Sequence, residues 1–422
     1  MMADDTNEFV DVVPDKLPVH LVPSRDQFLP WHKIRKEYIR QFQWGKLTID
    51  TIKRYWKQQL DRPEVSPFLE DSPDEPPFEI PLHQQFQRPL RCLVIPGDDL
   101  LDVRALVRDI EHLNYVVRYL GFNQSHDSND VGTRVHIANN AVTSHPSVMR
   151  DSRVVGDRFE MIARNNSLAE RNLREYGPFH VVNLDFCGSL FPNTAKDTQD
   201  YYDAIHKLLV YQFASQKSEW LLFMTTEVEP DLVHFGKLQV LCKQMRKNFD
   251  SYDDFAESLS NLVPPSSLQR VDQTVNITGL SSDQIVSMFG VALGKWLIKL
   301  CQNAHPRWTI AMRQSYKYTI NAEKGVVMLA LAFALRPNVT PPIDDMGVST
   351  LAVTVKAYPD ERDCALKLVK SVAAINDVDV LLEKDDVLKS KLREMQADLL
   401  QSAGYDRDAY IAWVNAGEGT TN

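Results

Sequence analysis

Short apolar runs alternate with amphipathic helical stretches between residues 90 and 304, and this alternation constrains the fold more than any other feature of the chain. The clearest strands expected are Arg91–Pro96, Tyr115–Phe122, Phe179–Leu184 and Trp220–Thr226. Strands that alternate with helices form a mostly parallel sheet with helices on both faces. We therefore expect an α/β fold with a doubly wound, mostly parallel sheet.

Three further strands bring the expected sheet to seven. Thr133–Ala138 is expected to be the third strand in chain order, and Trp308–Ile320 and Val326–Leu335 the last two. Five residues separate the last two strands, which is the length of a hairpin loop, so the sheet should end in an antiparallel hairpin. The helices expected between the strands are Leu100–Leu113, Gly156–Tyr176, Thr198–Gln216, Pro230–Phe249, Tyr252–Leu262 and Ser282–Ala304.

Proline and charge divide the chain into three expected regions around this alternation. Proline removes a backbone donor and resists helix, so a proline-rich stretch before the first strand is expected to be a linker. The basic sequence before it has helical spacing and is expected to form two short helices broken near Gly45. The regions are an N-terminal arm, 1–89, with its basic segment 31–62 and linker 63–89; an α/β domain, 90–336; and a helical C-terminal region, 337–422.

Composition excludes several classes of protein. No run approaches the ~20 apolar residues that a membrane helix needs, and the first residues lack the order of a secretory signal. The five cysteines are far apart without a C-x-x-C pair, and the histidines have no metal-ligand spacing. We expect a soluble cytoplasmic protein with no metal site and no disulfide framework.

The segment Phe179–Pro192 contains the most informative motif. Its apolar run ends in Asp185, and a tight turn through Gly188 and Ser189 follows, at the sheet edge where open α/β folds bind ligands. Together with the terminal hairpin, this pattern resembles class I S-adenosylmethionine-dependent methyltransferases, whose seventh strand is inserted antiparallel. The Asp-x-x-Gly-Ser spacing is loosely similar to tRNA guanine-N2 dimethyltransferases, and the strand-end acid to three-Cys-motif partner proteins.

The resemblance implies that the loop Ile95–Arg104 holds S-adenosylmethionine. Gly97 would let the backbone approach the cofactor, and Asp98 or Asp99 would accept a hydrogen bond from its amino group. Asn123, at the end of the second strand, would bond the ribose. The loop has one glycine where the family has several, and Asn123 stands where the family has an acid. A strand–helix turn without ligand, with Asp99 as helix N-cap, is the open alternative.

Asp185 stands in the position of the family's catalytic motif, without the prolines that usually follow it. The resemblance implies that Asp185 orients or accepts from a substrate amine, while Phe186 stacks on a base. The alternative is that Asp185 caps the turn and Phe186 packs in the core. Cys187 has no basic neighbour in sequence to lower its pKa, so we expect it to be a buried, unreactive thiol.

The segment between Trp31 and Arg62 is basic, with nine Lys or Arg against three acids, in a chain whose net charge is -10. Cations neutralise phosphates and aromatic rings stack on bases, so one interpretation is a nucleic-acid contact. The other is an amphipathic helical hairpin whose aromatic side chains pack on the main domain. The cations assigned to the nucleic-acid contact are Lys33, Arg35, Lys36 and Arg40.

Two functions follow from these patterns. The first is S-adenosylmethionine-dependent methyl transfer to a nucleic acid. The second is a catalytically inactive methyltransferase-like scaffold that binds a protein or nucleic-acid partner in a bacterial anti-phage defence complex. The opening Pro30–Trp44 is similar to that of uncharacterised bacterial proteins encoded near mobile-element or phage-defence genes. A Rossmann-like domain for another nucleotide is a third interpretation.

Overall fold

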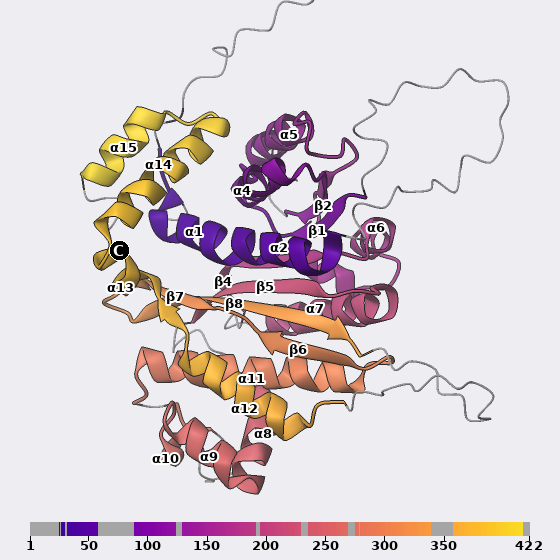
Figure 1. Ribbon diagram of the computed structural model, residues 1–422, viewed down its shortest axis with the longest axis vertical. Helices are drawn as coiled ribbons and strands as arrows, with labels where there is room; N and C mark the ends of the chain where they lie inside the picture. Colours follow the sequence, from indigo (N-terminus) through magenta and orange to yellow (C-terminus); the bar gives the residue numbers. More distant parts are fainter. Residues whose placement is uncertain are drawn as a thin grey trace, which may run out of the picture.

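A mixed, mostly parallel β-sheet with helices on both faces forms the centre of the molecule (Figure 1). The sheet has nine strands in the order β3-β2-β1-β4-β5-β8-β7-β9, with β6 also paired to β8. The α/β class expected from the sequence is thus confirmed. The computed structural model describes residues 25, 27–29, 32–57, 88–123, 129–190, 195–228, 235–268, 275–277, 279–338 and 358–416.

The parallel half of the sheet contains the first five strands. Their apolar runs are buried almost throughout, as expected for strands covered on both faces by helices. Four of them coincide with expected strands. The five are β1 (Leu90–Val94), β2 (Val117–Phe122), β3 (Arg153–Val155), β4 (Val181–Ser189) and β5 (Trp220–Val228).

The antiparallel half is organised around β8 (Val326–Pro337), which lies between β5 and β7 (Tyr316–Asn321) and is antiparallel to both. The expected terminal hairpin is therefore confirmed. The single strand expected at Trp308–Ile320 is instead two, β6 (Trp308–Met312) and β7, and both pair with β8. The two-residue β9 (Asn376–Asp377) extends this edge parallel to β7.

The expectation of a strand at Thr133–Ala138 is wrong, because these residues lie in α5 (Asn129–Thr143). Val135, Ala138 and Val142 are buried at spacings of three and four, which places them on one face of a helix. A six-residue window is too short to separate this spacing from strand alternation. The third strand is β3, which comes later in the chain.

One long helix precedes the sheet, in place of two short helices broken near Gly45. It runs from Ile34 to Trp56 through α1 (Ile34–Ile39), a π-helical segment, α2 (Lys46–Thr51) and a second π-helical segment. Gly45 has helical dihedral angles, φ -61° and ψ -54°. The glycine instead allows α4 (Leu101–Ile110) to approach, since a Cβ at this position would overlap the carboxylate of Asp109.

Two hydrophobic cores lie on opposite faces of the sheet. On one face the long helix buries Ile34, Trp44 and Trp56 against the strands, beside α4 and α5. Figure 1 shows this helix lying across the sheet, so it is part of the α/β layers. The other face is covered by α6 (Leu168–Tyr176), α7 (Ala195–Ser215), α8 (Phe235–Ser251), α9 (Asp253–Ser260), α11 (Ser282–Asn303) and α12 (Glu361–Ala373), with the short α10 (Pro265–Leu268) nearby.

The C-terminal helices return to the carboxyl edge of the sheet. They are α13 (Val378–Glu383), α14 (Asp386–Ser402) and α15 (Arg407–Asn415). Leu101 and Ala105 of α4 pack against Leu400 and Tyr410 in a third, small core. Residues from both ends of the described chain therefore lie beside the loop that follows β1.

Helix α11 is, among the described residues, the one helix long and apolar enough to be a candidate membrane span, with a mean hydropathy of 1.3. Its apolar window is 72% buried inside the protein. It packs against β6 and β8 on one side and α8 and α12 on the other. This burial is that of a core helix of the α/β domain.

Candidate functional site

A cavity of about 370 Å³ lies at the carboxyl edge of the parallel strands. It is lined by the loop that follows β1, by Asn123 after β2, and by Asp185 and Phe186 of β4. The tight turn predicted through Gly188 and Ser189 is wrong, because β4 continues to Ser189 and its pairing with β5 shifts register after Asp185. β1 and β4 are neighbours, and the chain continues from them toward opposite edges of the sheet. Such a switch point is where open α/β sheets bind ligands, and the volume lies within the range of ligand pockets.

Most residues singled out from the sequence meet at this cavity. Of the residues predicted to bind the cofactor, the substrate or nucleic acid, Lys33 and Arg35 do not line it. The lining residues among them are Lys36, Arg40, Gly97, Asp98, Asp99, Asn123, Asp185 and Phe186. The cavity also has lining residues that sequence reasoning missed, because no local pattern indicated them, and these include Asp102, Arg134, Glu160, Tyr201 and Tyr405.

The loop after β1 has an open glycine and a left-handed residue. A Cβ added at Gly97 would meet no atom within 4 Å, so this part of the backbone is accessible. Leu100 adopts φ 52° and ψ 33° at the N-cap of α4, a conformation unusual for a residue other than glycine. Its backbone nitrogen donates to the carbonyl of Gly97 at 3.0 Å, which closes the turn.

Asp99 is not the N-cap of α4, so the capped-turn interpretation is wrong in this detail. The N-cap is Leu100, without a side-chain cap. The Asp99 carboxylate instead accepts hydrogen bonds from Arg25 Nη1 at 2.5 Å and Tyr405 Oη at 2.7 Å. Asp99 therefore ties the β1 loop to both ends of the described chain, which leaves Asp98 as the more accessible acid.

Asn123 holds this loop from the neighbouring strand. Its Nδ2 donates to the carbonyl of Pro96 at 3.0 Å and to Asp98 Oδ1 at 3.2 Å. The side chain is mostly buried. Asn123 therefore positions the carboxylate of Asp98 at the cavity.

Asp185 forms an ion pair with Lys36 of α1. Lys36 Nζ lies 2.5 and 2.6 Å from the two carboxylate oxygens, and 4.8 Å from the centre of the Trp44 ring. Burial by itself would lower the pKa of Lys36, but the charge of Asp185, aided by Tyr318 and Asp102, raises it overall. Lys36 is therefore a cation, and it occupies both oxygens of the strand-end acid.

A second buried pair extends this network. Arg40 Nε donates to Asp102 Oδ1 at 2.9 Å, and Arg40 Nη1 donates to Gln396 Oε1 at 3.1 Å. On the same helix, Glu37 accepts from Arg108 at 2.7 Å. These contacts join the long helix to α4 and α14, and they give the inner wall of the cavity a mixture of both charges.

The four cations predicted to contact nucleic acid are buried or paired with acids in the structure. Lys36 and Arg40 are buried in the pairs described above, and Arg35 forms an ion pair with Asp379 of α13. Lys33 is buried as well, and burial lowers its pKa. Their acidic partners belong to distant elements, so sequence spacing could not indicate them.

Phe186 forms an apolar wall of the cavity. Its ring meets Phe159 edge-on at 6.1 Å and Tyr201 edge-on at 5.0 Å. The side chain is 5% exposed. Phe186 thus packs in the core, as one interpretation expected, and also lines the cavity. The side chain of Cys187 lies outside the described residues.

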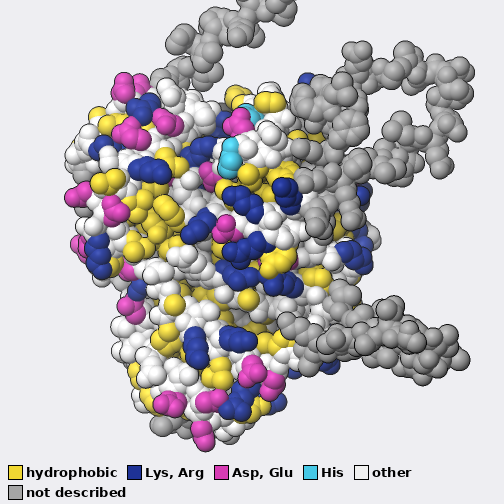
Figure 2. Space-filling model, viewed as in Figure 1, with side chains coloured by type: hydrophobic (Ala, Val, Ile, Leu, Met, Phe, Trp, Pro, Cys, Tyr) yellow, Lys and Arg dark blue, Asp and Glu magenta, His cyan; other side chains and the backbone are white. Residues whose placement is uncertain are grey.

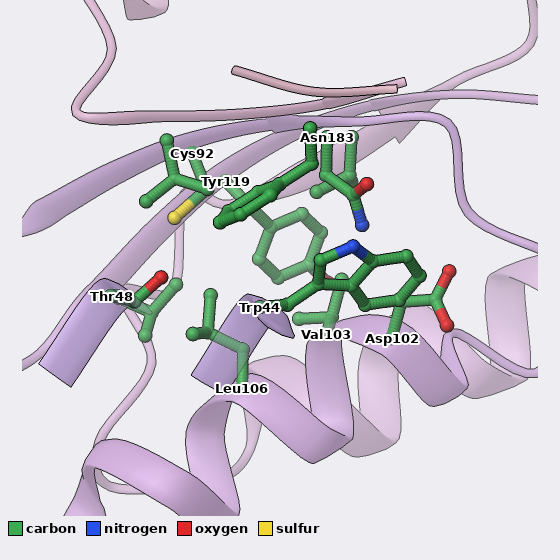
Figure 3. Close-up of a pocket in the computed structure, with 12 residues that line it drawn as sticks. Trp44, Thr48, Cys92, Asp102, Val103, Leu106, Tyr119 and Asn183 are labelled. Carbon is green, nitrogen blue, oxygen red and sulfur yellow. The ribbon is translucent and has the colours of Figure 1, made fainter. Parts of the chain in front are cut away.

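A second cavity, of about 20 Å³, lies between the long helix and the sheet (Figure 3). Figure 3 shows Trp44, Asp102 and Asn183 on one side of it, with Cys92 and Thr48 on the other. Burial raises the pKa of the Cys92 thiol well above its ordinary value, which makes it unreactive. This cavity is too small for a cofactor.

The protein is thus an α/β protein with a charged cavity at the switch point of a mixed sheet. The chain belongs to the PP_RS20740-like family, whose family model matches residues 25–415. No curated protein and no solved structure matches the chain.

Proposed function

We propose that this protein is a cytoplasmic, class I methyltransferase-like protein that binds S-adenosylmethionine in the carboxyl-edge cavity. The observation that carries the proposal is the sheet order, in which β8 lies antiparallel between β5 and β7. This is the way in which that superfamily inserts its last strand. The cavity at the β1–β4 switch point supports the same proposal.

The lining residues fit such a cofactor. The open backbone at Gly97 allows a close approach, and Asp98, held by Asn123, accepts from an amino group. Glu160 also lines the cavity, paired with Arg158, and its neighbour Phe159 contacts Phe122 of β2, the strand that carries the family's ribose-binding acid. The bound cofactor would supply an electrophilic methyl group. Phe186 would exclude water from the apolar side of the site.

The proposed substrate is a nucleic acid, with Asp185 as the group that accepts from its amine. The Lys36 ammonium now takes the place that such an amine would occupy on both carboxylate oxygens. Methyl transfer therefore requires that Lys36 move away from Asp185. The Lys36–Asp185 ion pair also favours a second candidate function, a catalytically inactive scaffold in a defence complex. In such a scaffold the ion pair would stay formed.

Cofactor binding is tested by isothermal titration with S-adenosylmethionine and S-adenosylhomocysteine. We expect micromolar binding that is lost in Gly97→Val and Asp98→Ala. Asp363→Ala, which removes an exposed acid on α12, is the matched control and should bind normally. No heat with either ligand at millimolar concentration would contradict the proposal.

Catalysis is tested separately by transfer of a labelled methyl group to total cellular RNA and DNA. An enzyme should lose transfer in Asp185→Asn while keeping cofactor binding and an unchanged circular dichroism spectrum. Cofactor binding by the wild type without any transfer would instead support the scaffold.

A further inference from the structure

The second half of the long helix presents a separate group of cations to solvent. The four cations, Lys46, Lys53, Arg54 and Lys57, are spaced by seven, one and three residues, so they lie on one side of the helix. Asp50 is the one acid in this half of the helix. The exposed cations are Lys46, Lys53, Arg54 and Lys57, here called the basic stripe.

The basic stripe has no acidic partners within the part of the chain that the structure describes. This contrasts with Lys36 and Arg40, which are buried in ion pairs on the first half of the same helix. The chain as a whole has a net charge of -10, so a concentration of unpaired cations is exceptional on it. Exposed like charges repel, and a polyanion would relieve that repulsion.

A partly exposed aromatic ring lies beside the basic stripe, on the side of the helix that contacts β8. Tyr55 is 39% exposed, and the guanidinium of Arg336 stacks over its ring at 4.4 Å from the ring centre. Arg336 is itself held by Glu219 and donates to Tyr55 Oη. Figure 2 shows Lys and Arg side chains gathered where the end of this helix crosses the strands. The ring is thus held at the surface by Arg336, next to the basic stripe in the chain.

We propose that the basic stripe and Tyr55 form a binding surface for single-stranded nucleic acid. Cations on one helix face contact successive phosphates, and an exposed ring stacks on a base that is not paired. Lys46 and Lys57 are eleven residues apart, about 16 Å along the helix, so the stripe is long enough to contact several phosphates of one strand. A duplex hides its base faces, so the aromatic ring favours a single strand.

This proposal deepens the proposed function, and rests on it for nucleic acid as the partner. The surface is distinct from the cavity, since Lys53 lies seventeen residues, or roughly 25 Å, along the helix from Lys36. A strand bound here would lie on the face that the long helix covers. Binding to the stripe requires neither the cofactor nor Asp185.

The test is fluorescence anisotropy of labelled oligo(dT), oligo(U) and a duplex of equal length, without cofactor. The stripe variant changes Lys46, Lys53, Arg54 and Lys57 to Gln. The control variant changes four exposed lysines elsewhere to Gln, which alters net charge equally: Lys243, Lys370, Lys384 and Lys391.

We expect the full-length wild type to bind the single strands, with affinity falling steeply as salt increases. Four phosphate contacts predict a slope of log K against log salt of about -3. The stripe variant should bind at least tenfold more weakly with a shallower slope, and the control within twofold. Tyr55→Ala should weaken binding severalfold at unchanged salt slope.

Three results would overturn the proposal. They are no binding of any probe at low salt, equal weakening in the stripe and control variants, or tighter binding of the duplex than of the single strands. Because the stripe and control variants change exposed side chains, thermal unfolding of both should match the wild type. Since the assay contains no cofactor, its failure is distinguishable from failure of S-adenosylmethionine binding in the titration.

Discussion

The two halves of the helix from Ile34 to Trp56 are both rich in cations but place them in opposite environments. In the first half, Lys36 and Arg40 are buried and paired with acids of β4 and α4. In the second half, Lys53 and Arg54 face solvent without acidic partners among the described residues. The comparison shows that the number of charges in a segment does not indicate what those charges do.

The difference has an energetic consequence. A buried ion pair adds little net stability, but loss of one partner leaves an uncompensated charge in a poorly solvated place. An exposed lysine keeps its water and costs little to replace. Equal substitutions in the two halves should therefore have very different effects on the free energy of unfolding.

The largest effect is expected for Lys36→Met. This change leaves the buried Asp185 carboxylate without its cation, which should lower the free energy of unfolding by about 3–5 kcal/mol. Urea denaturation measures it, with Lys46→Met as the matched control from the exposed half. A loss below about 1 kcal/mol for Lys36→Met would mean that the pair is not maintained in solution.

Acid pH should destabilise both ends of the long helix. Burial lowers the pKa of His32 to about 4 and that of His180, which lies against Trp56, to about 3. Both pKa values lie below the unfolded value near 6.5, so the unfolded state binds more protons and stability falls as pH drops below 6.5. At pH 5, each histidine should cost about 2 kcal/mol.

His180→Gln tests this pH dependence, because glutamine does not titrate and can still accept from the Arg91 backbone nitrogen. The difference in unfolding free energy between pH 7 and pH 5 should shrink by about 2 kcal/mol relative to wild type. An identical pH dependence in the variant would show that His180 is not buried as a neutral ring.

A smaller effect is expected at the junction of the two halves. Gly45→Ala places a methyl group against the Asp109 carboxylate, and overpacking of this kind costs typically about 1–3 kcal/mol. The better helix propensity of alanine, about 1 kcal/mol, offsets part of that cost. Thermal unfolding should therefore show a net destabilisation, whereas Gly97→Ala, which meets no atom within 4 Å, should be close to neutral.

The smallest effect is expected for single changes in the exposed half. Lys53→Gln and Lys57→Gln should each change the unfolding free energy by less than about 0.5 kcal/mol, since neither is paired within the described residues. Urea denaturation at low and high salt measures this. A loss above about 1 kcal/mol would indicate a stabilising contact and weaken the contrast between the two halves.

Much of the fold could be predicted from local patterns. The apolar runs at β1, β2, β4 and β5 identified strands correctly because buried parallel strands are apolar at nearly every position. Short segments were less predictable. Thr133–Ala138 contains β-branched residues and covers less than two helical turns, so the helical spacing of its apolar residues could not be recognised. β3 has only three residues, too few to show the alternation of a strand.

The same limit applies to the site. Gly97, Asp98 and Asp185 were identified because they directly follow or end apolar runs, and the carboxyl ends of parallel strands meet at one edge. Tyr405 and Glu160 line the same cavity without any such signal. Their positions depend on how the C-terminal helices and the segment before α6 pack over the loops.

The sequence by itself determined the α/β alternation, the antiparallel end of the sheet and the presence of Asp185 in β4, because each depends on neighbouring residues. Only the tertiary structure decided which side chains those residues contact. Lys36 lies 149 positions from Asp185, and Asp99 lies 306 positions from Tyr405. Such pairings require desolvation and close packing of distant elements, and neither is present in any local pattern of residues.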